Sequence, residues 1–298
     1  MDAGGDAGAS DGGADAPSSV DAGADASRAD SGSSDAGGAD AGALGPFGAP
    51  VRVAALDTPA SEDDPSLTGD MLEIFFNSAR SGGAGSGDIW TSTRERVDAP
   101  WAEPTPVTAL NAASEETSPE VSLDGSILYF TRYGGAGGAD VYVTTRTSRS
   151  APWGMPSAVP ELNTTATDWA PSVTADGLTA YMASSRSGSA RVWRTTRSST
   201  TAPWRTPTRI DAVGAGPDYD PYVAGDELSL LFTSYRGASG DIYAATRATT
   251  AVEFGDVAPV EEVNTASDEN DPWLSPDGRT LFFNSDRSGD DAIWTATR

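Results

Sequence analysis

Four residue types are missing from the 298-residue sequence, which contains no lysine, histidine, cysteine or glutamine. Without cysteine the chain has no disulfide framework and no thiolate nucleophile, and without histidine it has no imidazole general base. The same absences exclude the His and Cys ligand sets that hold zinc. All 19 basic residues are therefore arginines, and acid–base chemistry on this chain would have to use carboxylates.

Positive charge is also scarce, because 44 acidic residues against 19 arginines give a formal net charge of -25. This is the wrong sign for neutralising nucleic-acid phosphates or for lying on an anionic membrane. No apolar run approaches the length of about 18 residues that crosses a bilayer, and the longest, such as residues 228–232, suits a buried strand. We expect no nucleic-acid partner and no membrane span.

Residues 1–43 contain almost nothing that could form a core: 13 Ala, 10 Gly, 9 Asp, 7 Ser, one Arg, Met1, Pro17 and Val20. Such a segment cannot offset the entropy lost on ordering. The composition predicts a disordered linker over residues 1–43 and one folded unit over residues 44–298.

A repeat of about 51 residues organises that folded unit. A strand-like string recurs five times, as DIWTSTR (88–94), DVYVTTR (140–146), RVWRTTR (191–197), DIYAATR (241–247) and AIWTATR (292–298). Each copy is preceded by a marker proline, at 65, 119, 171, 221 and 272, and then by an Asp-Gly or Gly-Asp pair and a short apolar run. These pairs supply the positive φ angles of tight hairpins.

Three further segments follow the pattern Trp-x-x-Pro-x-x-Val/Ile, from Trp101, Trp153 and Trp204, with a weaker copy from Phe254. Four antiparallel strands per repeat, with no helical periodicity, are typical of propeller blades. The last repeat lacks its fourth strand, whereas residues 47–56 match that strand's pattern. We therefore predict an all-β, five-bladed propeller whose N-terminal strand completes the last blade. The blades are roughly 62–111, 113–163, 165–214, 215–264, and 265–298 with 47–56.

The repeated unit, seen most completely from Asp277-Gly278 through Phe283, Ser285, Arg287, Ile293 and Trp294, resembles the TolB-type, WD-repeat-like β-propeller repeat. The resemblance covers residues 44–298. It implies a binding or scaffolding role, with function to be argued from the site itself. Blade 3 departs from the pattern, because Arg191 stands where Asp is usual, and blades 1 and 4 invert the turn to Gly-Asp.

An acid stands three residues before every marker proline, at Glu62, Glu116, Asp168, Asp218 and Glu269. Because first strands line a propeller's channel, these carboxylates are expected to encircle one mouth, where they could bind a ligand or recruit Ca²⁺. The alternative is structural: a repeated arginine, at 80, 132, 186, 236 and 287, could pair with each acid. The sequence favours the structural interpretation.

Positions that break the symmetry are better candidates for recognition. Two residues before the proline the repeats read Asp63, Thr117, Trp169, Tyr219 and Asn270, and one residue after it they read Ser66, Glu120, Ser172, Tyr222 and Trp273. Trp169 and Tyr219, beside Asp168 and Asp218, could stack on a sugar or clamp a peptide. The alternative is that they only plug the mouth.

We expect a monomeric, non-enzymatic binding or scaffolding propeller that recognises a protein, peptide or glycan with its loop face and needs no cofactor, although Ca²⁺ is possible. The alternatives are a Ca-stabilised, lectin-like propeller and a carboxylate-dependent glycoside hydrolase, for which Asp168 with Glu62 or Glu269 is the first pair to test. The Asp/Ala/Gly/Ser tail is similar to spacers that follow the lipid-modified cysteine of bacterial surface lipoproteins. That cysteine and a signal peptide are absent here, and we expect an envelope or extracellular location.

Overall fold

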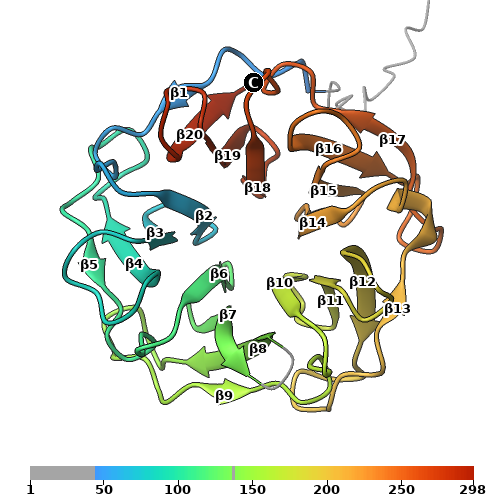
Figure 1. The fold of residues 1–298 in the computed structure, drawn as a ribbon, viewed down its shortest axis with the longest axis horizontal. Helices are drawn as coiled ribbons and strands as arrows, with labels where there is room; N and C mark the ends of the chain where they lie inside the picture. The colour runs from blue at the N-terminus through green and yellow to red at the C-terminus, as the bar shows by residue number, and fades with distance from the viewer. Residues whose placement is uncertain (1–43, 136–137) are drawn as a thin grey trace, which may run out of the picture. The chain divides into compact units, whose positions relative to one another are not determined.

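The computed structural model describes residues 44–135 and 138–298. The linker expected over residues 1–43 lies outside the described residues. Among these residues, twenty strands form five four-stranded antiparallel sheets arranged around a central axis (Figure 1). The five-bladed propeller predicted from the sequence is confirmed.

Each blade runs from an innermost to an outermost strand. Blade 1 contains β2 (Glu62–Leu67), β3 (Glu73–Ser78), β4 (Asp88–Thr93) and β5 (Thr105–Pro106). Blade 2 contains β6 (Glu116–Val121), β7 (Ile127–Gly135), β8 (Gly138–Thr145) and β9 (Ser157–Ala158). Blade 3 contains β10 (Asp168–Val173), β11 (Thr179–Ser184), β12 (Arg191–Thr196) and β13 (Thr208–Arg209). Blade 4 contains β14 (Asp218–Val223), β15 (Ser229–Ser234), β16 (Asp241–Thr246) and β17 (Gly255–Pro259).

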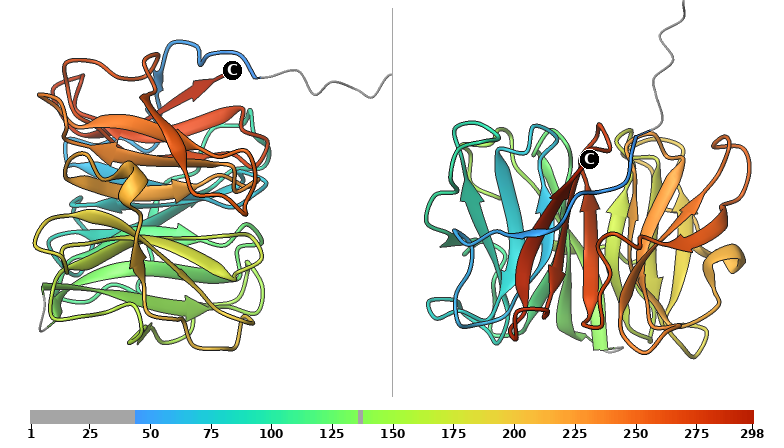
Figure 2. Two further views of the ribbon diagram at one scale, coloured as in Figure 1. Left: turned by 90° about the vertical axis from the view of Figure 1, so that its right-hand side faces the viewer. Right: turned by 90° about the horizontal axis from the view of Figure 1, so that it is seen from above.

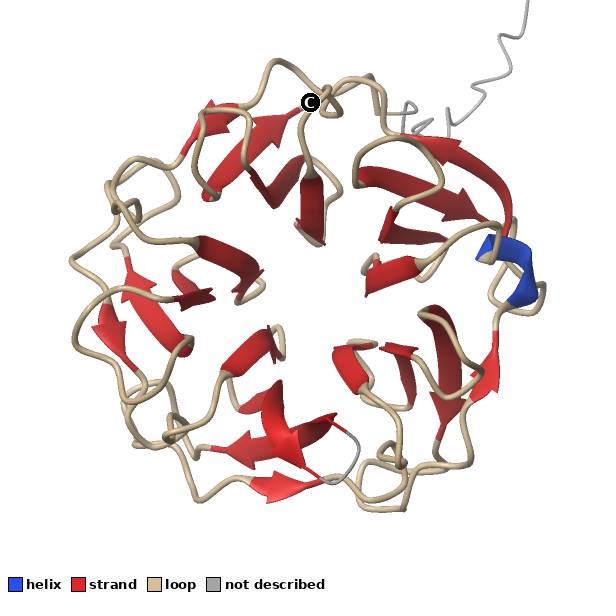
Figure 3. Ribbon diagram, viewed as in Figure 1, coloured by secondary structure: helices blue, strands red, loops and turns tan. Residues whose placement is uncertain are grey.

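Blade 5 combines the two ends of the described chain, with β18 (Glu269–Leu274), β19 (Thr280–Ser285) and β20 (Ala292–Thr297) followed outward by β1 (Val51–Arg52). A single 3-10 turn, η1 (Asp211–Val213), is the helical element among the described residues (Figure 3). No helix in the described part of the chain has the length and apolar character needed to cross a bilayer.

Closure of the ring by the N-terminal strand is confirmed. Val51 and Arg52 pair with Thr295 and Trp294, and the backbone N–H of Val53 donates to the Ile293 carbonyl at 2.8 Å. Leu56, just after β1, is 1% exposed. Figure 2 shows the segment containing β1 lying along the blade formed by β18 to β20. The pairing removes an open sheet edge, which would otherwise be available to other chains.

A second repeated arginine clamps each third strand to the start of the fourth. Its Nε donates to a carbonyl of the hairpin turn, and its guanidinium lies 4.1 to 4.3 Å from the centre of a Trp or Phe ring. The pairs are Arg94–Trp101, Arg146–Trp153, Arg197–Trp204, Arg247–Phe254 and Arg298–Phe47. Arg298, which contacts Phe47, therefore extends the pattern across the point where the ring closes. A cation–π contact of this kind contributes about 0.5 to 2 kcal/mol.

The turns of blades 1 and 4 are not inverted, contrary to the sequence interpretation. Asp70 occupies the same place as Asp124 of blade 2, since each carboxylate accepts hydrogen bonds from the hydroxyl two residues earlier and the backbone N–H two residues later. The difference lies at the next position, where Met71 (φ 56°) and Glu227 (φ 57°) replace glycine in the left-handed region. The turn geometry is therefore kept at the cost of some backbone strain.

Candidate functional site

The five acids three residues before the marker prolines are structural in their surroundings. Each is 0% exposed and forms an ion pair with an arginine of its own blade at 2.6 to 3.2 Å. The pairs are Glu62–Arg80, Glu116–Arg132, Asp168–Arg186, Asp218–Arg236 and Glu269–Arg287. The pairing that the sequence favoured is thus present in every blade.

The expectation that these carboxylates encircle the channel mouth is corrected by their other contacts. Asp168 accepts hydrogen bonds from the Thr164 N–H at 2.6 Å, the Thr164 hydroxyl at 2.7 Å and the Ser184 hydroxyl. Arg186 also donates to the Leu162 carbonyl, so the pair fastens the loop from the preceding strand to the blade. None of the five acids lines either axial cavity described below. The residues that follow each acid in its innermost strand form a bulge.

The residue before each marker proline lies at that bulge, with φ between 46° and 54°. The five equivalent residues are Asp64, Ser118, Ala170, Asp220 and Asp271. Strand pairing shifts register at this point in every innermost strand. Bulges often redirect side chains next to functional sites. Here these residues and the prolines line a narrow axial cavity of about 40 Å³.

Three of these bulge residues are aspartates that meet on the axis. Asp64, Asp220 and Asp271 can each place a carboxylate oxygen within 4.8 Å of the others. Burial, followed by the charge of Asp64, raises the pKa of Asp220 to about 7. Burial and the charges of Asp64 and Asp220 also hold the pKa of Asp271 well above its usual range. Oxygen donors of this kind suit Ca²⁺ or Mg²⁺, and the possibility of Ca²⁺ stays a prediction.

The symmetry-breaking residues after the prolines form the next layer along the axis. Glu120 accepts hydrogen bonds from the hydroxyls of Ser66 at 3.2 Å and Ser172 at 3.4 Å. Tyr222 and Trp273 belong to the same layer, and their ring centres lie 6.0 Å apart. All five blades thus contribute to an asymmetric plug that contains one carboxyl group.

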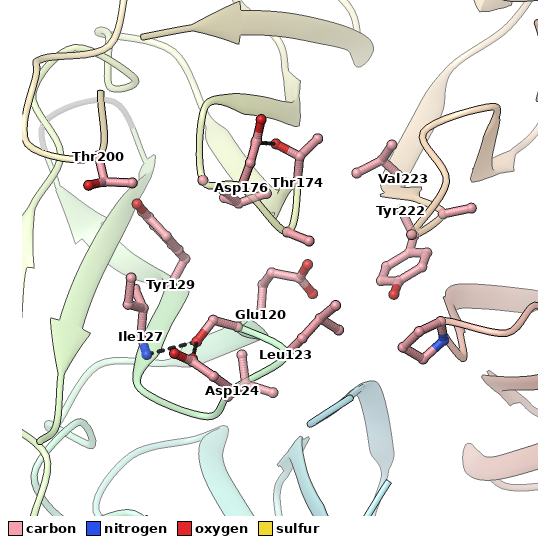
Figure 4. A pocket seen from close by; sticks show the side chains of 18 of the residues that line it. Glu120, Leu123, Asp124, Ile127, Tyr129, Thr174, Asp176, Thr200, Tyr222 and Val223 are labelled. Atoms are coloured by element: carbon pink, nitrogen blue, oxygen red, sulfur yellow. Dashed lines mark hydrogen bonds between the residues drawn. The ribbon is translucent and has the colours of Figure 1, made fainter. Parts of the chain in front are cut away.

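Beyond this layer lies a pocket of about 340 Å³ at the turn mouth, the end of the channel where the turns between first and second strands gather. Its walls are mostly apolar and include Leu123, Ile127 and Val223. Figure 4 shows the carboxyl group of Glu120 directed into the space between Leu123 and Tyr222. Apolar walls around a few convergent polar groups are typical of ligand pockets.

Glu120 has the chemistry of a neutral hydrogen-bond donor. Burial raises its pKa to about 8, although the hydroxyl of Ser66 and the backbone of Val173 partly oppose the shift. The other acids on the pocket's rim, Asp124 and Asp176, accept hydrogen bonds within their own turns. A hydrogen bond from Ser122 contributes most to lowering the pKa of Asp124. The pocket therefore combines a buried acid whose pKa is raised, Glu120, with an acid at its edge whose pKa is lowered, Asp124.

This arrangement predicts that stability falls as pH rises. The unfolded chain releases the Glu120 proton near its ordinary pKa of 4.5, whereas the folded chain keeps it until about pH 8. Across that window the folded state binds more protons, so the free energy of unfolding decreases, by about 3 to 5 kcal/mol for this group. Thermal melts at closely spaced pH values should show the decline, and Glu120→Gln should reduce its slope, leaving the part that comes from the raised pKa values of Asp220 and Asp271. A matched change of the exposed Glu103 to Gln should leave the slope as in the unmodified protein.

The predicted aromatic candidates lie at the opposite mouth, where the innermost strands begin. Trp169 and Tyr219 are half-buried, and their ring centres are 5.8 Å apart. Tyr235 continues the cluster, 5.6 Å from Tyr219, and is 41% exposed. Tyr235, Asp64, Asp220 and Asp271 were not among the residues predicted from the sequence. The position before the marker proline is an aspartate in only three of the five blades. This difference between blades could have indicated Asp64, Asp220 and Asp271 as candidates.

No protein-family model matches this chain, and no curated protein sequence matches it. Solved structures share its fold. An endo-arabinase from Bacteroides thetaiotaomicron is 11% identical, with a TM-score of 0.61 over 83% of this chain and 96% of that one. TolB from Acinetobacter baumannii is 16% identical, with a TM-score of 0.54 over 82% of this chain and 55% of that one.

A family 117 glycoside hydrolase from Zobellia galactanivorans is 14% identical, with a TM-score of 0.55 over 85% of this chain and 90% of that one. The neighbours thus include TolB and glycoside hydrolases alike. At these identities the likeness shows the propeller fold alone, and the site must decide between binding and hydrolysis.

Proposed function

We propose that this chain is a non-enzymatic binding propeller that recognises a protein, peptide or glycan with a loop face. The observation that carries the proposal is the turn-mouth pocket, which is about 340 Å³ in volume and has a single carboxyl group, Glu120, at its base. A neutral carboxyl can donate one hydrogen bond to a ligand carbonyl or hydroxyl. The apolar walls would supply most of the binding energy.

The carboxyl geometry supports binding over glycoside hydrolysis. Hydrolysis requires two carboxyl groups about 5 to 5.5 Å or 6.5 to 9.5 Å apart, on either side of a sugar. Asp64, Asp220 and Asp271 approach one another more closely than that, around a cavity of about 40 Å³. A space of this size holds water molecules and excludes a sugar ring. Asp168, named with Glu62 or Glu269 as a catalytic pair, is fully buried against Arg186.

An envelope or extracellular location is part of this proposal. Its support is the composition of residues 1–43, which is similar to the spacers of bacterial surface lipoproteins. Fractionation of the native host should recover the protein outside the cytoplasm. Recovery from cytoplasmic fractions alone would remove this part of the proposal.

The binding role can be tested with peptide and glycan arrays run beside a hydrolysis assay on the same sugars. We expect binding without release of product. The variant Ala175→Trp should weaken binding at least about tenfold, because residue 175 lines the pocket and its exposed side chain can grow into the space without disturbing the core. The matched variant Ala248→Trp places the same side chain on exposed surface outside the pocket and should bind normally.

Two results would contradict the proposal. One is sugar release that Glu120→Gln or Asp271→Asn abolishes, which would establish the hydrolase alternative. The other is equal binding by Ala175→Trp and Ala248→Trp, which would place recognition away from the pocket.

A further inference from the structure

The mouth where the innermost strands begin, called here the acidic mouth, gathers carboxylates that the proposed pocket does not use. They are Asp63, Asp64, Glu115, Asp220, Asp268, Asp271 and Asp291. None of the seven is in an ion pair with an arginine in the described part of the chain, because Arg80, Arg132, Arg186, Arg236 and Arg287 are all held by the buried acids. The acidic mouth therefore gathers seven carboxyl groups that have no arginine partner among the described residues.

Aromatic rings stand among these acids. Tyr235, 41% exposed, packs edge-to-face on Tyr219, which in turn contacts Trp169. The charges of Asp268, Asp220 and Asp271 help burial to raise the pKa of Tyr235 to about 12. Tyr133, 39% exposed, is in the field of Glu115, Asp64, Asp220 and Asp63, and its pKa is also raised, mainly by burial. Ring faces surrounded by negative charge attract cations.

One acceptor at this mouth lacks a donor. The Oδ1 atom of Asp63 is buried and has no hydrogen-bond partner among the described residues. Burial and the charges of Asp64, Asp291, Glu115 and Asp220 hold the pKa of Asp63 well above its usual range. A buried acceptor without a donor costs about 1 to 3 kcal/mol, and a cationic N–H group placed here would remove that cost.

The chain itself shows which cation fits such surroundings. In blade 3 the guanidinium of Arg186 lies between the carboxylate of Asp168 at 2.6 Å and the ring of Trp193 at 5.1 Å. The same combination of arginine, acid and ring recurs in the other blades. The acidic mouth presents the acid and the ring without the arginine. Guanidinium groups stack on aromatic faces and donate in pairs to carboxylates, which ammonium groups do less well.

We propose that the acidic mouth binds an arginine side chain carried by an extended segment of a partner protein. The guanidinium lies against Tyr235 and Tyr219. Its N–H groups donate to Asp268 and to the three aspartates that meet on the axis, Asp64, Asp220 and Asp271. This site is separate from the turn-mouth pocket at the other end of the channel, so it goes beyond the function proposed above. The net charge of -25 would also steer a basic segment toward the protein.

The test is fluorescence anisotropy with a labelled glycine/serine peptide that carries two arginines, compared with the same peptide carrying citrulline, its uncharged isostere. The solutions contain EDTA, so that divalent cations do not occupy the aspartates. We expect the arginine peptide to bind at least about tenfold more tightly than the citrulline peptide. Its affinity should fall as salt concentration rises.

Variants separate this site from general attraction between opposite charges. Tyr235→Ala should weaken binding of the arginine peptide by about 2- to 30-fold, whereas Tyr235→Phe keeps the ring and should bind normally. Asp268→Asn should weaken binding, whereas Glu103→Gln removes an equal charge from exposed surface elsewhere and should not.

Three results would each overturn the proposal. The first is equal affinity for the arginine and citrulline peptides, and the second is a lysine peptide that binds as tightly as the arginine peptide. The third is an equal loss of affinity in Asp268→Asn and Glu103→Gln. If the arginine peptide fails to bind while Ala175→Trp still weakens binding of the array ligands, only the acidic-mouth proposal fails. If the arginine peptide binds as expected while Ala175→Trp leaves binding of the array ligands unchanged, the turn-mouth pocket proposal fails and the arginine site stands.

Discussion

Replacing Asp168 with alanine should destabilise the propeller by about 3 to 5 kcal/mol, because it leaves Arg186 as an unpaired cation inside the blade. The Arg186 side chain is 13% exposed, so water cannot replace the lost carboxylate. The Thr164 N–H and the Ser184 hydroxyl would lose their acceptor as well. Urea unfolding followed by tryptophan fluorescence would measure the loss.

A surface ion pair provides the control for this experiment. Asp98 and Arg96 lie 2.7 Å apart, but their side chains are 78% and 67% exposed. Asp98→Ala should therefore change the free energy of unfolding by about 1 kcal/mol or less. If Asp168→Ala and Asp98→Ala cost the same, the buried acids are not structural ties, and their assignment would return to ligand binding.

Deleting residues 44–58 should abolish stable monomers. The deletion removes β1, the buried Leu56 and the ring of Phe47 that lies 4.3 Å from Arg298. Loss of a buried Phe and a buried Leu costs about 5 to 10 kcal/mol together, comparable with the whole stability of a typical domain. The deletion also exposes β20 as an open edge that can pair with other chains. Circular dichroism melts and light scattering would report the unfolding and the association.

The variant Val51→Ala is the control that shows whether any change in β1 destabilises the protein as strongly as the deletion does. Val51 pairs with Thr295 through its backbone, but its side chain is 63% exposed. Truncating it should change stability by about 0.5 kcal/mol or less. A deletion variant that melts like the unmodified protein and stays monomeric would mean that the N-terminal segment does not close the ring.

The fold could be predicted from the sequence because each blade repeats the same local signals. The marker proline, the hairpin turn and the fourth-strand aromatic recur at nearly fixed intervals, and Phe47 fits the series as the partner of Arg298. The pairing of Glu62 with Arg80 and its equivalents was predictable for the same reason, since the first strand begins beside the end of the second. Repetition makes long-range contacts visible in the sequence.

The candidate site was harder to predict because it depends on a local backbone feature. Because innermost strands line the channel, Glu62 and its equivalents were expected at its mouth. Instead, Asp64, which lies at the bulge with φ 54°, meets Asp220 and Asp271 on the axis. Glu120 was recognised as a break in symmetry, but its raised pKa results from burial in the folded ring, against the opposing effect of hydrogen bonds from Ser66 and Ser172. Burial of a single side chain cannot be predicted from the spacing of residues in the sequence, so this rise in pKa could not be predicted either.

The most direct test of the account is an NMR titration of the glutamate side-chain carboxyl carbons, followed from pH 3 to pH 10. Glu120 is assigned by the signal that disappears in Glu120→Gln. The account predicts that this carboxyl group titrates near pH 8 and that an array ligand seated in the turn-mouth pocket perturbs its signal. Titration of Glu120 near its ordinary pKa of 4.5, with no response to the ligand, would contradict a neutral donor at the base of the pocket and the binding function built on it.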